Sequence, residues 1–298
     1  MGPSDEETAS RRAGAEVIDG WEWDETLFSG SAPYYQRGRL PYAPGLAEVL
    51  TQTLGLDARG RLIDVGCGPG ILALAFAHVF RELVGVDPDG GMIAEAGRRA
   101  AEAGAGTKTR WVRARAEDLP AGLGSFDVAV FGQSFHWMDR DLVAATIMTM
   151  LCPGGALVHI SDLKSDIPGV AGLPHPAVPY AAMEALVKEY LGPVRRAGRG
   201  MLPHGTPGGE AEVFRRTGFL GPERHVVPAG QALERSEDDV VAWVFSMSSS
   251  APHLFGTRRA AFENDLRRIL RDASAAGRFS ERPPSTEVFV WRRPATRP

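Results

Sequence analysis

The stretch Leu62-Ile-Asp-Val-Gly-Cys-Gly-Pro-Gly70 restricts the possible folds of this chain more than any other part of its sequence. A short, mainly apolar segment that predicts a strand runs directly into three glycines, and an apolar segment that predicts a buried helix follows from Ile71 to Phe80. Glycines at such a turn allow the backbone to approach a ligand closely, beside the N-terminus of the next helix. The stretch therefore predicts a ligand-binding loop between a strand and a helix.

Strands and helices alternate from this loop onward. The sequence predicts strands at residues 62–65, 83–87, 110–114, 126–131 and 156–160, and helices at 44–56, 71–80, 91–103 and 140–151, with Asp89 capping the third helix. Several of the strands are apolar throughout, which is typical of parallel strands covered on both faces. We therefore expect an α/β fold with a doubly wound, Rossmann-like parallel sheet.

The second half of the chain has a different pattern. After residue 162 a proline-rich stretch leads to helices predicted at 180–191, 211–217, 238–245 and 257–273, with strands near 224–227 and at 286–291. We expect a flexible arm at residues 1–20 and a single domain at 21–298. Its core would comprise about 43–163, 211–228 and 285–293, and two insertions at about 164–210 and 229–284 would form a small helical lid.

Three residues indicate which ligand the glycine loop suits. The dinucleotide-binding fingerprint requires a third glycine where this chain has Ile71. Asp64, in the first strand, would repel a pyrophosphate and attract an ammonium group. Asp87, at the end of the second strand, is placed to accept hydrogen bonds from both hydroxyls of a ribose. A ligand with a ribose, an amino-acid tail and no phosphate is S-adenosylmethionine.

These residues resemble the motifs of the class I S-adenosylmethionine-dependent methyltransferases. Asp64 to Gly70 is similar to the first motif, Val86-Asp87 to the second, and Arg115-Ala-Glu-Asp-Leu-Pro120 to the third, in which Arg115 stands where many relatives have an acidic residue. The resemblance implies a sheet of seven strands, the last of them antiparallel. It also implies S-adenosylmethionine as the cofactor and S-adenosylhomocysteine as the product.

Two further patterns resemble the small-molecule branch of this family, type 11, which includes the trans-aconitate methyltransferases. Gln133-x-x-His-Trp137 follows the fourth predicted strand, and Tyr35-x-x-x-Arg-x-x-Tyr42 precedes the core, with Leu40 in place of the usual proline. The Asn/Asp-Pro-Pro-Tyr motif of enzymes that methylate nucleobases or glutamine does not occur in the sequence. The resemblance implies methyl transfer to an oxygen, nitrogen or carbon atom of a small molecule. A carboxylate- or hydroxyl-bearing acceptor of secondary metabolism is favoured.

The resemblance also implies the residues of the site. The cofactor-binding residues would be Asp64, Gly66, Cys67, Gly68, Gly70, Asp87, Pro88, Met92, Ala116, Glu117, Asp118, Gln133, Ser134, Tyr35 and Arg39. The substrate-binding residues would be Trp137, Tyr34 and Tyr42. His136 would be the catalytic base, because imidazole titrates near neutral pH. We expect no metal site, since the histidines and cysteines lack the spacing of metal ligands.

Most of these roles have an alternative. His136 would otherwise pack beside the adenine or the sheet, and Arg39 would be a solvated side chain rather than a clamp for a carboxylate. The aromatic residues would form a wall around the sulfonium or the substrate, or pack as part of an N-terminal arm. Residues 246–252, which are rich in serine, would line the acceptor site or, as we favour, end one helix and cap the next. The whole chain could instead be a nicotinamide-dependent oxidoreductase, or a non-catalytic relative that binds the same cofactor.

Composition and charge narrow the range of partners. The 33 basic and 37 acidic residues give a net charge of −4, so the chain lacks the cationic field that collects a phosphate backbone. The N-terminus does not have the pattern of a secretory signal, and the two cysteines, Cys67 and Cys152, fit a reducing compartment. We expect a cytoplasmic monomer or homodimer that binds a small-molecule acceptor and neither nucleic acid nor membranes. Cys67 should be buried and unpaired within the loop.

Overall fold

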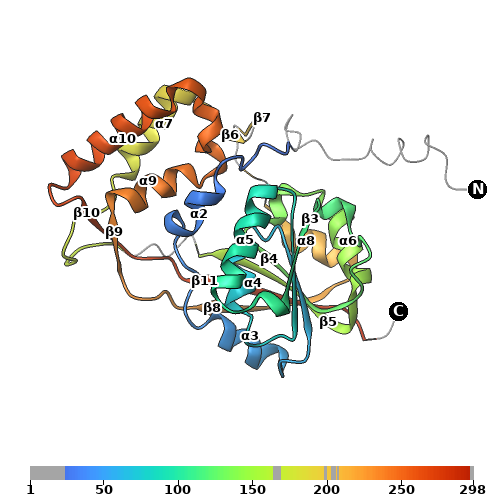
Figure 1. Ribbon diagram of the computed structural model, residues 1–298. Coiled ribbons are helices and arrows are strands. Elements are labelled where there is room, and N and C mark those ends of the chain that lie inside the picture. The colour runs from blue at the N-terminus through green and yellow to red at the C-terminus, as the bar shows by residue number, and fades with distance from the viewer. Residues whose placement is uncertain (1–23, 164–168, 198–199, 203–205, 207, 296–298) are drawn as a thin grey trace, which may run out of the picture.

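A seven-stranded sheet lies at the centre of the molecule, in a computed structural model that describes residues 24–163, 169–197, 200–202, 206 and 208–295. The strand order is β3-β2-β1-β4-β5-β11-β8 (Figure 1). Strands from β3 to β5 run parallel, whereas β11 pairs antiparallel with both β5 and β8. The strands are β1 Arg61–Val65, β2 Glu82–Asp87, β3 Thr109–Arg113, β4 Phe126–Gly132, β5 Leu151–Asp162, β8 Leu220–Val227 and β11 Thr286–Arg292. The predicted doubly wound α/β fold with an antiparallel last strand is confirmed.

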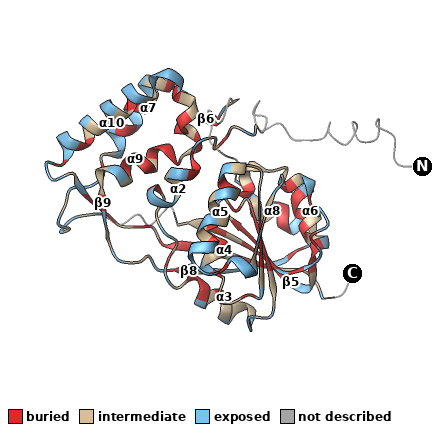
Figure 2. Ribbon diagram, viewed as in Figure 1, coloured by how far each residue is buried: buried red, intermediate tan, exposed pale blue. Residues whose placement is uncertain are grey.

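Helices cover both faces of this sheet. Helices α3 Leu46–Leu54 and α4 Ile71–Ala75 pack on one face, and α6 Arg140–Met150 and α8 Glu210–Thr217 pack on the other, while α5 Gly90–Glu102 lies against β2 and β3. The strands between these helix layers are largely buried (Figure 2). Strand β11 serves both layers, because Val288 and Val290 pack in the cluster with α3 while Trp291 packs in the cluster with α6.

One predicted helix is shorter than its pattern suggested. The apolar segment 71–80 was expected to be helical throughout, but α4 ends at Ala75. The residues that follow form tighter turns, in which Ala77 N donates to Leu74 O and Val79 N donates to Phe76 O. Phe76 and Phe80 are nevertheless buried. A series of partly buried turns can therefore have the same apolar pattern as a buried helix.

A smaller helical layer lies above one end of the sheet, at the upper left of Figure 1. It comprises α7 Tyr180–Leu191, α9 Glu237–Phe245, α10 Arg259–Ala273 and the hairpin β9 Leu233–Ser236 with β10 Arg278–Glu281; a short hairpin pairs β6 Arg196–Ala197 with β7 Gly200–Met201. The three helices share one apolar core, and all three were expected within two residues of these bounds. The two hairpins were not expected. None of the helices in the described ranges is long and apolar enough to cross a membrane.

Helix α2 Ala32–Gly38 packs against α9, about two hundred residues later in the chain. The contact leaves no room for a side chain at Gly38, since a Cβ there would stand 2.4 Å from the backbone carbonyl carbon of Ala242. The Ser31 hydroxyl donates to the backbone oxygen of Phe245 at 2.8 Å. We call α2 together with the helical layer the lid.

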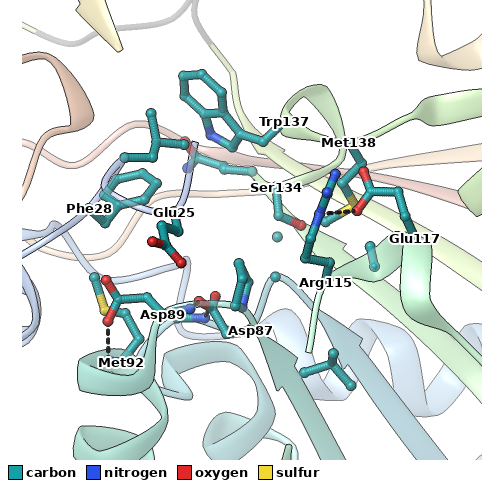
Figure 3. Close-up of a pocket in the computed structure, with 18 of the residues that line it drawn as sticks. Glu25, Phe28, Asp87, Asp89, Met92, Arg115, Glu117, Ser134, Trp137 and Met138 are labelled. Carbon is teal, nitrogen blue, oxygen red and sulfur yellow. Dashed lines mark hydrogen bonds and ion pairs between the residues drawn. The ribbon is translucent and has the colours of Figure 1, made fainter. Parts of the chain in front are cut away.

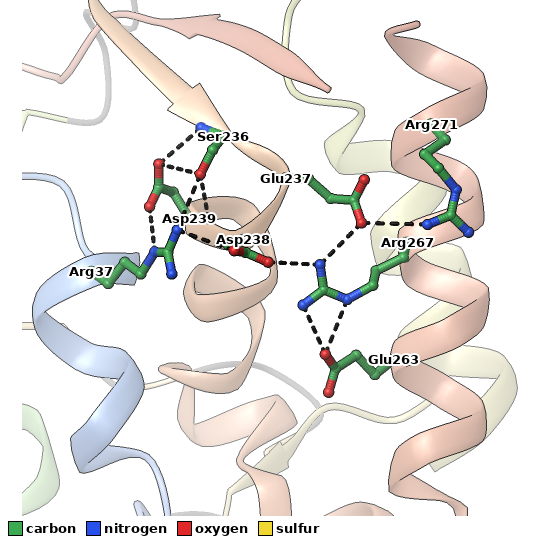
Figure 4. Close-up of polar contacts among 8 residues, drawn as sticks. All are labelled: Arg37, Ser236, Glu237, Asp238, Asp239, Glu263, Arg267 and Arg271. Carbon is green, nitrogen blue, oxygen red and sulfur yellow. Dashed lines mark hydrogen bonds and ion pairs between the residues drawn. The ribbon is translucent and has the colours of Figure 1, made fainter. Parts of the chain in front are cut away.

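Charged side chains connect the helices of the lid at its surface (Figure 4). Arg37 of α2 donates to Asp239 at 2.6 Å, near the start of α9. Arg267 of α10 forms ion pairs with Glu237 at 3.0 Å and Asp238 at 2.7 Å. Because Arg37 and Asp238 are half exposed, these pairs determine orientation more than stability.

A buried ion pair lies beneath this surface network. The guanidinium of Arg235 donates to Glu281 at 2.8 Å, and its other terminal nitrogen donates to the backbone oxygens of Gly38 and Asp239 at 2.7 and 2.9 Å. The Tyr180 hydroxyl donates to the second oxygen of Glu281. One buried guanidinium therefore links α2, the β9–β10 hairpin and α9 by hydrogen bonds.

Candidate functional site

The glycine loop joins β1 to α4, and its conformation explains why it needs glycine. The backbone nitrogens of Gly66 and Cys67 both donate to the oxygen of Val86 in β2, and Gly66 has a φ of 71°. A Cβ at Gly66 would stand 2.5 Å from the Cβ of Ser134. At Gly68, whose φ is 52°, a Cβ would meet nothing within 4 Å and would project into open space. The loop thus leaves space at the carboxyl ends of the strands, where ligands bind in such sheets.

Two aspartates of the strands flank this loop: Asp64 is buried, and Asp87 is partly buried. The Asp87 carboxylate accepts hydrogen bonds from the backbone nitrogens of Gly68 and Asp89, each at 2.9 Å, which fixes the orientation of both oxygens. Asp64 accepts one such bond, from Ala73 at 3.2 Å. Burial raises the pKa of Asp87 to about 6 and the pKa of Asp64 to about 7. A ligand that is cationic or donates hydrogen bonds would therefore stabilise the ionised form of both carboxyls.

A cavity, which we call the loop cavity, lies directly over the loop (Figure 3). Its walls contain eleven of the residues expected at the site, namely Tyr35, Gly66, Gly68, Asp87, Pro88, Met92, Ala116, Glu117, Gln133, Ser134 and Trp137. They also contain Glu25 and Phe28, whose side chains enter from the segment before α2, and Asp89, Arg115 and Met138. These last five residues were missed. The Asp89 side chain accepts from Gly91 and Met92, as expected for the cap of α5.

The third motif forms a single turn of 3-10 helix, Ala116–Asp118. Ala116 and Glu117 face the loop cavity, and Glu117 is held by the backbone nitrogen of Asp139 at 2.9 Å and by an ion pair with Arg115 at 3.3 Å. Asp118 does not line the cavity. Its exposed carboxylate accepts from the backbone nitrogen of Arg115 at 3.2 Å and so closes the turn.

Gly70 also lies away from the cavity. Its φ is 74°, and a Cβ there would stand 2.5 Å from the indole ring of Trp111 and 3.3 Å from the Cβ of Ala96. Gly70 therefore permits close packing between the start of α4 and its neighbours. Cys67, by contrast, is buried and unpaired as expected, and burial raises its pKa.

A second cavity of about 350 Å³, the inner cavity, continues from the loop cavity toward the lid. The two share Phe28, Tyr35, Gly66, Gly68, Gly132, Gln133 and Trp137 as common walls. The inner cavity also contains Asp64, Cys67, Arg39, Tyr42 and His136 from the expected site. Asp162, at the end of β5, was not expected there. Burial, together with nearby Tyr35 and the two aspartates, raises the pKa of Tyr42.

Arg39 is positioned by the lid rather than solvated. Its guanidinium carbon lies 4.7 Å from the centre of the Tyr35 ring, and a terminal nitrogen donates to the backbone oxygen of Ser246 at 2.9 Å. Its Nε is buried and has no hydrogen-bond partner within the described part of the chain. The structure thus places a fixed guanidinium in the wall of the inner cavity.

Tyr34 is not brought to these cavities. Its ring packs 5.2 Å from that of Phe245, and its hydroxyl accepts from Arg259, so it belongs to the apolar core of the lid. Trp137 does line both cavities and contacts the ring of Phe28 at 6.3 Å.

The serine-rich segment, residues 246–252, fulfils part of each predicted role: it ends a helix, and one of its serines lines a cavity. The hydroxyls of Ser246 and Ser250 donate to backbone oxygens of the last turn of α9 and so end that helix. No serine side chain in this segment caps the short helices at Ser248–Ser250 and Pro252–Arg258, so the expected cap of the next helix is wrong. Ser248 lines the inner cavity.

A third and larger cavity, the sheet cavity, opens between the sheet and the lid and has a volume of about 960 Å³. It shares Gln133, His136, Asp162 and Trp243 with the inner cavity. Its own walls include His159 of β5, whose ring packs between Phe214 and Phe289 and whose pKa is lowered by burial. The sequence analysis did not identify His159 as a residue of the site.

Comparison with known proteins identifies this arrangement. Residues 63–159, which run from β1 through β5, match the family model described as a methyltransferase domain. This part of the chain is similar to a methyltransferase domain. The matched residues carry the glycine loop, Asp87, the third motif and His136, and the methyltransferase family that they resemble uses S-adenosylmethionine.

Relatives of the methyltransferase domain agree with this assignment. An uncharacterized methyltransferase of Mycobacterium bovis is 32% identical over 144 residues, which are 48% of this chain and 55% of the relative. A ubiquinone biosynthesis O-methyltransferase of Azorhizobium caulinodans is 32% identical over 132 residues, 42% of this chain and 51% of the relative. The chain thus spans about half the length of these curated relatives. The solved YcgJ protein of Bacillus subtilis is 16% identical, with a TM-score of 0.48 over 83% of this chain and 97% of that protein.

Proposed function

We propose that the protein transfers a methyl group from S-adenosylmethionine to a small-molecule acceptor bound between the sheet and the lid. One observation carries the proposal: the loop cavity and the inner cavity share walls at Gly66, Gly68, Gln133 and Trp137. A cofactor over the glycine loop and an acceptor in the inner cavity would therefore lie side by side. Methyl transfer is an in-line displacement, and it needs this alignment more than it needs acid or base catalysis.

The residues of the loop cavity fit the cofactor. Asp87 has two oriented oxygens for the ribose hydroxyls, and Gly68 leaves free the space that a side chain would fill. Ala116 and Glu117 would border the adenine, and the acidic groups at Glu25, Asp64 and Asp87 favour a cation over a phosphate. When bound, the cofactor supplies an activated methyl group on a positively charged sulfur.

The chain itself would supply positioning, exclusion of water and a base. Tyr35 and Trp137 close the loop cavity on the lid side. His136 lines both the inner and the sheet cavity, where it would accept a proton from an acceptor hydroxyl. Its ring also packs 4.8 Å from that of Trp137, which supports the alternative that it only shapes the wall.

An oxygen atom is the acceptor that we favour. A relative in ubiquinone biosynthesis is named as an O-methyltransferase, and the guanidinium of Arg39 in the wall of the inner cavity suits a carboxylate or a hydroxyl. The net charge of −4 favours a small metabolite over a nucleic acid.

Calorimetry tests the cofactor. We expect S-adenosylmethionine and S-adenosylhomocysteine to bind, and we expect Asp87→Ala to weaken both by about tenfold or more, because charge-assisted hydrogen bonds are lost. Asp272→Ala is the matched control, since that carboxylate is exposed near the end of α10 and does not line the cavity. Absence of binding by either compound would contradict the proposal. Binding of reduced nicotinamide dinucleotide instead, seen by its fluorescence, would favour the oxidoreductase alternative.

Turnover is tested by release of S-adenosylhomocysteine from a library of hydroxylated and carboxylated acceptors. If His136 is the base, His136→Ala lowers turnover about a hundredfold and leaves cofactor affinity unchanged. An equal loss of both would place His136 in the wall of the cofactor site. Cofactor binding without turnover of any acceptor would favour a non-catalytic relative.

A further inference from the structure

The lid contains a cavity of its own, about 490 Å³ in volume, which we call the lid cavity. Its walls are mainly apolar and come from α7, from the segment that follows α7, and from α9 with the turn after it; they include Met183, Val187, Leu191, Val194, Val244 and Met247. An apolar cavity of this size is suited to the hydrocarbon part of a small molecule.

The lid cavity meets the inner cavity at three residues that line both: Arg195, Trp243 and Met247. The inner cavity is the one that contains His136 and adjoins the loop cavity. A molecule that occupies both the lid cavity and the inner cavity would therefore lie beside Arg195.

Arg195 differs from the other cations of the lid cavity. Lys188 is paired with Glu184 at 2.7 Å, and the Nε of Arg196 donates to the backbone oxygen of Leu191 at 3.3 Å. The Arg195 side chain forms no ion pair or hydrogen bond with any residue that the structure describes. Burial lowers its pKa, and no neighbouring carboxylate offsets that effect. Arg195 is nevertheless solvent-exposed, and its guanidinium is therefore available to bind an anionic ligand at the junction of the two cavities.

We propose that Arg195 binds the carboxylate of the acceptor, and that the lid cavity holds the apolar part of the same molecule. This inference rests on the proposed function and deepens it, because it names the acceptor class as an amphipathic carboxylate. A guanidinium presents two parallel donors that match one carboxylate. The Arg195 guanidinium, which has no partner among the described residues, also carries the one positive charge that a carboxylate needs. The carboxylate or a hydroxyl beside it would then face the inner cavity, where the methyl group is transferred.

Calorimetry with simple probes tests the inference without knowledge of the natural acceptor. The probes are butanoate, hexanoate, octanoate and decanoate, with octanamide as the uncharged partner of octanoate. With S-adenosylhomocysteine present, we expect affinity to rise with chain length and octanoate to bind about tenfold or more tightly than octanamide.

Variants locate this preference for charge. Arg195→Ala should abolish the difference between octanoate and octanamide, and Arg195→Lys should retain part of it. Arg268→Ala is the control and should leave the difference unchanged, since the Arg268 side chain is 66% exposed on α10 and does not line the lid cavity. Retention of S-adenosylhomocysteine affinity in each variant checks that the fold is intact.

Three results would overturn the inference: no binding by any of the carboxylates, equal binding of octanoate and octanamide, or a preference that survives in Arg195→Ala. The proposed function fails separately, since it requires cofactor binding, whereas the carboxylates can also be titrated without cofactor. Carboxylate binding in a chain that bound no cofactor would support Arg195 as an anion site and refute the methyl transfer.

Discussion

We expect the substitution Asp64→Asn to increase the free energy of unfolding near neutral pH. The carboxyl is 1% exposed, accepts one backbone hydrogen bond from Ala73, and has a pKa of about 7 in the folded chain against 3.8 ordinarily. The folded chain therefore keeps a proton on Asp64 at pH values where the unfolded chain has released it. The free energy of unfolding falls as pH rises from about 4 to about 7, and the loss is complete above that range.

The magnitude follows from the two pKa values. At about 1.4 kcal/mol for each tenfold change in proton affinity, ionised Asp64 lowers the stability of the folded chain by at most about 4 kcal/mol at neutral pH and above. Asp64→Asn keeps an oxygen for the backbone nitrogen of Ala73 and removes the buried charge. We expect the variant to be more stable than the wild-type chain by about 2–4 kcal/mol near pH 8, and this advantage to shrink as pH falls toward 5.

Urea unfolding at a series of pH values measures this difference. Asp272→Asn is the matched control, since Asp272 is exposed near the end of α10, and we expect its stability to follow that of the wild-type chain. Calorimetry on Asp64→Asn should also show weaker cofactor binding, because the carboxylate no longer attracts the ammonium group of the cofactor. A variant that is less stable near pH 8, or whose advantage does not change with pH, would refute the reasoning.

Three further substitutions test how the lid is held. Gly38→Ala should destabilise the chain by about 1–3 kcal/mol in urea unfolding, because its Cβ would meet the backbone of α9 at 2.4 Å, whereas Gly169→Ala, with open space around it, should change little. Arg235→Ala should cost about 3 kcal/mol or more, since it leaves Glu281 buried without its partner, and the added change Glu281→Gln should recover part of this loss; equal stability of the single and double variants would argue against the pair. Arg37→Ala should cost less than about 1 kcal/mol and less still at high salt, because the side chain is 52% exposed.

The parts of the fold that could be predicted are those determined by neighbours in sequence. The glycine loop and the alternation of strands and helices are local patterns, and they predicted the sheet and the cap at Asp89 correctly. The docking of α2 on α9 could not be predicted in this way. It depends on the absence of a side chain at Gly38 and on the reach of Arg235, contacts that join residues about two hundred positions apart.

Some residues of the candidate site could likewise be predicted from local sequence, and others could not. Asp87 and Gln133 follow directly from the ends of strands, and the structure places both in the loop cavity. Glu25 and Phe28 reach that cavity from a segment without helix or strand periodicity. Its aromatic composition suggested a covering segment that includes Phe28, but nothing indicated Glu25. Gly70 shows the opposite case. It fits the motif, yet in the structure the absence of a side chain at Gly70 makes room for the indole of Trp111.

The position of β11 affects the order in which this protein can fold. Strand β11 comes last in sequence among the strands of the sheet, but it lies inside the sheet between β5 and β8. During synthesis, β8 therefore has no partner in the sheet, and β5 has an open edge, until residues 286–292 have left the ribosome. An open edge of this kind can pair with another chain. The nascent protein would thus be most prone to aggregation immediately before its last strand is made.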